Sequence, residues 1–194
     1  MGSKEQLALM TEESVLVEKL REPDSREAAF RELVKTYQER LYWHIRRIVL
    51  THDDADDVLQ ETFIKVFRNI EGFKGDSKLF SWMYRIATNE ALSFLKRNSK
   101  IQGVDKEEAQ QYLMQRLTAD PYFDGDQAEL ELQKALAALP EKQRLVFNMK
   151  YFEEMKYDDI SEVLDTSVGA LKASYHLAVK KIKKHLKGYI PETP

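Results

Sequence analysis

The sequence has no cysteine among its 194 residues, which excludes disulfide bonds, thiolate metal ligands and a cysteine nucleophile. Glycine and proline are scarce, with seven and five residues. Together with long stretches of 3.6-residue apolar period, this scarcity favours a mostly helical protein. No apolar run reaches the length of a membrane span, and the first residues have no apolar signal-peptide core. We therefore expect a cytoplasmic protein without membrane insertion.

The charged residues are segregated along the chain. The formal net charge of −3 would by itself argue against a DNA-binding protein. However, residues 99–133 contain three basic and eight acidic residues, whereas residues 166–190 contain six lysines and no acid. Because phosphate contact depends on a local basic footprint, the C-terminal segment remains a candidate for nucleic-acid binding.

Apolar periodicity predicts an all-α fold of two small helical domains joined by a flexible linker. Three helices are expected over about residues 26–49, 53–70 and 77–97, with a further helix before them over Glu5–Leu20. Together they form a predicted domain over residues 5–98. Residues 99–126 are acidic, lack a sustained apolar face and end in turn-forming residues, which indicates a linker. Helical periodicity returns in a second predicted domain over residues 127–190.

The end of the second domain has the spacing of a helix-turn-helix. A helix is expected over residues 158–164 and another over residues 167–186, with only Asp165–Ser167 between them. Near the start of the second helix, the residues expected to point outward are Ser167, Gly169, Lys172, Ala173, His176 and Lys180. A solvated, lysine-rich surface helix is the simpler alternative, but the preceding helix and the tight turn favour DNA recognition.

A dense acidic face is predicted on the helix that begins near Asp53. Its spacing does not match an EF-hand loop, which needs a central glycine and a glutamate at its twelfth position. The four histidines form no metal-binding pattern, and the chain has neither a phosphate-binding glycine loop nor a nucleophile elbow. We therefore expect no metal, no cofactor and no catalytic residue. An acidic face suits a protein partner that has a basic surface.

Aromatic and basic residues alternate over residues 73–85. The rings of Phe80, Trp82 and Tyr84 cannot all face one core, because neighbouring positions on a helix point in different directions. At least one ring is therefore expected to be exposed or partly exposed, and stacking of an unpaired base on such a ring contributes about 1–3 kcal/mol. Ordinary core packing is the alternative, and it is favoured for Trp82 and Met83.

These segments, in this order, resemble bacterial RNA polymerase sigma factors of the extracytoplasmic-function (ECF) group in the sigma-70 family. The resemblance covers residues 28–186. Residues 53–67 resemble the core-binding helix of region two, and residues 73–89 resemble the promoter-melting segment. Residues 139–144 and the helix-turn-helix resemble region four. Two independent motifs in the right order make this resemblance specific.

The resemblance implies an alternative sigma factor that binds core RNA polymerase, directs it to specific promoters and assists promoter melting. The polymerase-docking residues would be Asp53, Asp56, Asp57, Gln60, Glu61 and Phe63. Contacts to the minus-ten element would come from Lys74, Gly75, Asp76, Ser77, Lys78, Phe80, Trp82, Arg85, Asn89, Lys96 and Arg97. Contacts to the minus-thirty-five element would come from Ser167, Gly169, Lys172, Ala173, His176 and Lys180. The expected partners are core RNA polymerase, promoter DNA and an anti-sigma factor.

One departure from the family pattern affects the recognition helix. Many members carry arginines where this chain has Ser174, Leu177 and Val179. Bidentate readout of guanine by arginine is therefore missing from these positions, and upstream recognition would depend more on Lys172, backbone contacts and DNA shape.

Two other functions fit parts of the sequence. A two-domain helix-turn-helix regulator would form a stable dimer and bind a palindromic site. A helical interaction protein without DNA function would tolerate neutralisation of its C-terminal lysines.

Overall fold

The computed structural model describes residues 13–102, 115 and 127–187. All regular elements within these residues are helical, which confirms the predicted all-α class. In chain order they are α2 (Pro23–Val49), α3 (His52–Asn69), a 3-10 turn (Ile70–Gly72), α4 (Leu79–Gln102), α6 (Gln127–Ala137), α7 (Glu141–Phe147), a π-helical turn (Asn148–Phe152), α8 (Tyr157–Leu164) and α9 (Val168–Leu186). Residues 13–21, ahead of α2, are helical as well.

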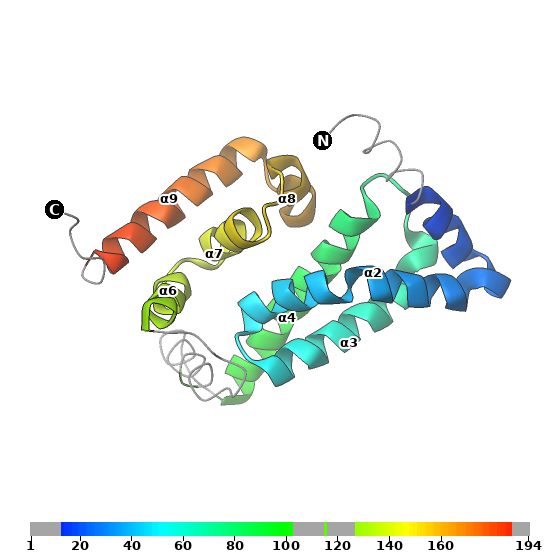
Figure 1. The fold of residues 1–194 in the computed structure, drawn as a ribbon, viewed down its shortest axis with the longest axis horizontal. Helices are drawn as coiled ribbons and strands as arrows, with labels where there is room; N and C mark the ends of the chain where they lie inside the picture. The colour runs from blue at the N-terminus through cyan, green and yellow to red at the C-terminus, as the bar shows by residue number, and fades with distance from the viewer. Residues whose placement is uncertain (1–12, 103–114, 116–126, 188–194) are drawn as a thin grey trace.

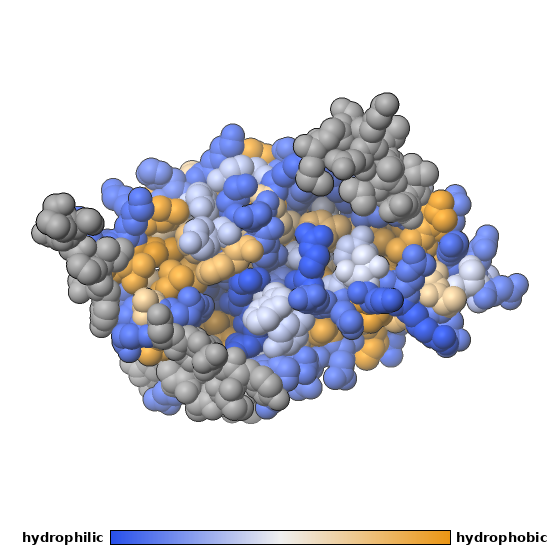
Figure 2. Space-filling view, viewed as in Figure 1, coloured by the Kyte–Doolittle hydropathy of each residue, from blue (hydrophilic) through white to orange (hydrophobic). Residues whose placement is uncertain are grey.

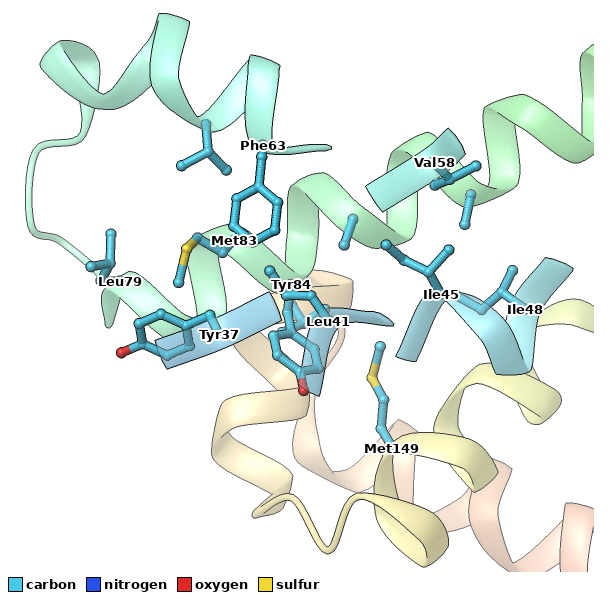
Figure 3. Close-up of a cluster of buried hydrophobic side chains, with 14 of the residues drawn as sticks. Tyr37, Leu41, Ile45, Ile48, Val58, Phe63, Leu79, Met83, Tyr84 and Met149 are labelled. Atoms are coloured by element: carbon cyan, nitrogen blue, oxygen red, sulfur yellow. The ribbon is translucent and has the colours of Figure 1, made fainter. Parts of the chain in front are cut away.

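The helices α2, α3 and α4 form one helical group, in which α2 and α3 run side by side and α4 crosses them (Figure 1). The apolar stripes of the three helices meet in a core that contains Leu33, Leu41, Ile45, Val66 and Met83, each with no more than 1% of its surface exposed. Figure 3 shows part of this core around Leu41 and Met83. The predicted inward faces of these helices are therefore the faces that pack.

A sharp turn joins α2 to α3 at Leu50. This residue has a φ of 70° in the left-handed region, and its N–H donates to the Arg46 carbonyl at 2.9 Å. Such a conformation costs a non-glycine residue roughly 1–2 kcal/mol. Because the Leu50 side chain is only 5% exposed, its burial in the core offsets that strain.

The last helix of this group is longer than the sequence predicted. We expected it to end near Arg97, but α4 continues to Gln102. The sequence offers no glycine or proline before Gly103 to stop it, so the acidic composition alone misplaced the boundary. The rest of the predicted linker, residues 103–114 and 116–126, lies outside the described residues, as do residues 5–12 of the expected first helix.

The second helical group contains α6 to α9. The sequence predicted one helix from Glu141 to about Phe152, whereas α7 ends at Phe147 and the chain continues as a π-helical turn. The helix-turn-helix is present, with α8 ending at Asp165 in a left-handed conformation with a φ of 47°. The hydroxyl of Ser167 then caps α9 by accepting from the Ala170 N–H at 3.5 Å.

The two groups share a continuous core. Leu145, Met149, Ile160 and Leu171 belong to the same buried cluster as the apolar residues of α2, α3 and α4. Figure 3 shows Met149 reaching from the second group toward Leu41 and Tyr84. In this arrangement α8 packs against α4, and the π-helical turn packs against α2 (Figure 1). Within the described residues, no helix has the length and apolar composition needed to cross a membrane.

Candidate nucleic-acid interface

The acidic face lies on the N-terminal half of α3. Asp53, Asp57, Gln60 and Glu61 are exposed, and Asp56 has a side chain that is 47% exposed. Steps of four residues place Asp53, Asp57 and Glu61 in one row along the helix. Because Val58, Thr62 and Val66 are buried on the opposite side, the carboxylates point away from the core. The face is therefore free to meet a partner.

Phe63 differs from the other residues predicted for polymerase docking. Its side chain is only 9% exposed and packs edge-to-face on Phe30, with 6.2 Å between the ring centroids. The ring therefore supports the acidic face from beneath and is not available for contact with a partner in this structure. The aromatic residue in this motif fixes α3 on α2, which fixes the direction of the acidic row.

The loop between the 3-10 turn and α4 carries the first predicted minus-ten residues. Lys74, Gly75 and Asp76 are exposed, whereas Ser77 and Lys78 are half-buried. Gly75 has a φ of +80°, and a Cβ built on it would meet no atom within 4 Å. The backbone conformation, and not a lack of space, therefore requires glycine at this position.

Replacing Gly75 with alanine should lower the free energy of unfolding by about 1–2 kcal/mol, because an L-residue is strained at positive φ. Gly72→Ala is the matched control, since Gly72 lies in the same connection with open space around it and no positive φ. Denaturant unfolding of both variants measures the difference. Equal stability would show that Gly75 does not need the left-handed conformation.

The aromatic residues of α4 divide between packing and exposure. Tyr84 is 1% exposed, and burial together with the charge of Glu153 raises the pKa of its hydroxyl. Phe80 and Trp82 are half-buried. The ring of Trp82 lies against Phe73, and the ring of Phe80 lies under the Arg40 guanidinium at 4.7 Å. Two of the three rings are thus partly exposed, as expected.

Two of the predicted DNA-binding cations contact α8. Lys78 Nζ lies 2.5 Å from Asp159 Oδ1, and this hydrogen bond is the main cause of the raised pKa of the lysine. Arg85 donates to the Glu162 carbonyl from both Nε, at 3.1 Å, and its terminal nitrogen. Farther along α4, Asn89, Lys96 and Arg97 are exposed. The predicted minus-ten residues therefore lie along one helix and its preceding loop, partly covered by the second helical group.

A buried polar network joins the two groups beside these contacts. His44 on α2 is 1% exposed, and its Nδ1 and Nε2 lie 2.9 Å from Glu153 Oε1 and Thr88 Oγ1. Burial raises the pKa of Glu153, but the stronger effect of His44 and Arg47 lowers it overall. The Thr88 hydroxyl donates to the Tyr84 carbonyl at 2.7 Å, so it accepts from His44. With Glu153 ionised, both ring nitrogens of His44 donate, which is the imidazolium form.

The sequence gave no local signal for this network. Its four histidines looked scattered, because His44 and Glu153 are separated by 109 positions. Arg47 contributes to the same region by lying over the Phe152 ring at 5.0 Å from its centroid. These residues were missed because a contact between two domains leaves no periodic pattern in either one.

The recognition helix α9 exposes the residues predicted for the major groove. Ser167, Gly169, Lys172, Ala173, His176 and Lys180 are all exposed. The opposite face is fixed by Leu171, Ala178 and Ile182, which are buried. Of the three residues that replace family arginines, Leu177 is 45% exposed and Val179 packs against the core. The helix is thus anchored by its apolar face, and its N-terminal half is open.

A smaller apolar cluster lies where α6 meets α9. Figure 2 shows apolar side chains reaching the surface in this part of the molecule, on the left of the view, among largely polar surroundings. The half-buried residues of the cluster include Leu132, Val179 and Leu186. This surface lies apart from the exposed N-terminal half of α9.

Known proteins match both helical groups. The family model for sigma-70 region 2 matches residues 33–101, and the model for sigma-70 region 4 matches residues 129–182. The ECF RNA polymerase sigma-E factor of Haemophilus influenzae is 31% identical over 182 residues, which cover 90% of this chain and 95% of that protein. The RNA polymerase sigma-H factor of Pseudomonas aeruginosa is 32% identical over 185 residues, which cover 91% and 95%.

Solved structures show the same fold. CnrH in complex with the cytosolic domain of CnrY matches with a TM-score of 0.66 at 20% identity, over 92% of this chain and 99% of that one. The sigma factor RpoE in complex with the anti-sigma factor NepR from Bartonella quintana matches with a TM-score of 0.63 at 20% identity, over 83% and 98%. Both are helical throughout the matched regions that define the fold class.

The chain belongs to the sigma-70 family of RNA polymerase sigma factors, in its ECF group. It is therefore an alternative sigma factor that acts in transcription initiation, as its motifs predicted. The dimeric regulator and the interaction protein without DNA function are not favoured, because regions 2 and 4 are both matched in the expected order.

Proposed function

We propose that this chain docks on core RNA polymerase through the acidic face of α3 and directs the enzyme to promoters. The observation that carries this proposal is a row of exposed carboxylates, Asp53, Asp57 and Glu61, held on a rigid helix by a buried opposite face. Carboxylates arranged in this way complement a basic protein surface and steer its approach. The chain itself supplies no catalytic group, and it works in the cytoplasm where the polymerase acts.

The proposed division of labour follows the two helical groups. Residues 5–98 bind the polymerase and the minus-ten element, residues 99–126 link the domains, and residues 127–190 bind the minus-thirty-five element. In the second group, α9 enters the major groove with Lys172, Ala173 and His176, while Lys180 meets the phosphate backbone. The exposure of these four side chains supports this assignment.

Promoter melting is assigned to the loop and helix that follow α3. A flipped base would be held by the Lys74–Phe80 segment, where Gly75 lets the backbone turn tightly. The exposed side chains of Asn89, Lys96 and Arg97 would then hold the displaced strand along α4. Because bases stack on rings and phosphates pair with cations, the mixture of these groups on one helix suits single-stranded DNA.

An anti-sigma factor is the third proposed partner. Two proteins of the same fold were solved with a bound regulatory partner, described for one of them as an anti-sigma factor. In this chain, the half-buried apolar residues between α6 and α9 offer a surface that such a protein could cover.

Reconstituted transcription tests the proposed function. Purified core polymerase with this chain should produce transcripts from defined start sites on a genomic DNA library, whereas the core enzyme alone should not. The same assay on the recovered templates would identify the promoter sequence. Absence of start-site-directed transcripts from every template would contradict the proposed function.

A further inference from the structure

The contacts between the two helical groups involve residues that the proposed function needs for DNA. Lys78 is paired with Asp159 on α8 at 2.5 Å, and Arg85 donates to the carbonyl of Glu162. Glu162 lies in the last turn of α8, where carbonyl groups lack intrahelical partners and carry the negative end of the helix dipole. A carboxylate and a helix C-terminus thus occupy two cations in the way that phosphate groups would.

The same arrangement is held by a buried network. The side chains of His44 and Glu153 are 1% and 6% exposed, and they meet at 2.9 Å between α2 and the turn before α8. Removing one partner from a buried ion pair leaves the other charge without compensation, which is strongly unfavourable. The shared core adds Met149, which is fully buried between the groups.

The arrangement is closed without being optimally paired. One carboxylate oxygen of Glu162 is buried and has no hydrogen-bond partner among the described residues. A buried polar atom in this state costs free energy, which is recovered when water reaches it. The contact can therefore open when another partner competes for the same surfaces.

We propose that in the free chain α8 and the turn before it close over α4, so that Lys78 and Arg85 are withheld from single-stranded DNA until the groups separate. This inference rests on the proposed function, because it takes these two cations as strand-contacting residues. The acidic face on α3 stays exposed in the closed arrangement, with Asp53, Asp57 and Glu61 accessible. The polymerase can therefore dock first, and capture of the strand follows opening.

Two substitutions weaken the closed contact without adding bulk. Glu153→Gln removes the charge that compensates His44, and Asp159→Asn removes the carboxylate that holds Lys78. The matched control combines Glu154→Gln with Asp158→Asn, which makes the same charge change at neighbouring exposed positions. Any difference between the two double variants then reports the closed contact and not the overall charge.

The distance between the groups is measured by fluorescence energy transfer in the full-length chain. Because the sequence has no cysteine, Gln38→Cys on α2 and Ala138→Cys after α6 provide the only two thiols for labelling. Affinity is measured with a short, fluorescent single-stranded DNA of mixed sequence. An apparent affinity is reduced in proportion to the fraction of competent molecules, so opening should tighten binding.

The Glu153→Gln/Asp159→Asn variant should show lower energy transfer and about ten-fold tighter strand binding than the control variant. Equal transfer in the two variants would overturn the proposal, and so would lower transfer with unchanged affinity. Asp159→Asn alone, at a partly exposed position, repeats the test if the double variant unfolds. Polymerase binding by the unsubstituted chain is measured separately, so failure of the proposed function would be seen there and not in the energy transfer.

Discussion

Reversing the charges of Asp57 and Glu61 to arginine should weaken binding to core RNA polymerase by about 100-fold or more. The two carboxylates lie one turn apart on α3 and are exposed, so they can meet a basic partner together. Placing two cations against a basic surface replaces attraction by repulsion, which costs several kcal/mol. Titration of labelled chain with core polymerase measures the loss.

The fold should survive this double substitution. Neither side chain contributes to the core, and surface substitutions of this kind usually change stability by no more than about 0.5 kcal/mol. Glu18→Arg with Glu39→Arg is the matched control, because it reverses two exposed acids elsewhere in the same helical group. Comparable loss of polymerase binding in both variants would show that net charge, and not this face, drives docking.

Replacing Leu171 with alanine should lower the free energy of unfolding by about 2–5 kcal/mol. Its side chain is fully buried and belongs to the core that holds α9 against α8. Loss of this anchor should also remove specific binding to minus-thirty-five duplex DNA, since the recognition helix would no longer be held at a fixed angle. Denaturant unfolding measures the first effect, and competition with an unrelated duplex measures the second.

Leu177→Ala is the control for this prediction. It makes the same chemical change on the same helix, but at a position that is 45% exposed, so we expect a loss within about 0.5 kcal/mol. If both leucines gave the same loss of stability, the assignment of the buried and exposed faces of α9 would be wrong.

The sequence predicted the helices well because their apolar residues repeat at helical spacing. Leu33, Leu41 and Ile45 are buried as their steps of three, four and eight residues require. The boundary errors have local causes. The end of α4 was placed too early because acidic composition was read as a linker, and the π-helical turn after Phe147 preserves enough helical spacing to look like more of α7.

The arrangement of the two groups could not be predicted. Lys78 and Asp159 lie 81 positions apart, and each belongs to a segment whose own pattern is complete without the other. Amphipathic periodicity identifies the buried face of a helix, but it does not identify which element covers that face. Phe63 shows the same limit on a smaller scale, since a motif residue expected to meet a partner instead packs on Phe30.

The turn at Leu50 has a consequence for how this protein can change over time. A bulky residue held at positive φ is tolerated here because its side chain fills a space in the core. Glycine would relax the backbone but empty that space, whereas a polar residue would leave a buried group without a partner. This single hinge position therefore narrows the substitutions open to natural variation, and it does so at the joint that sets the direction of α3.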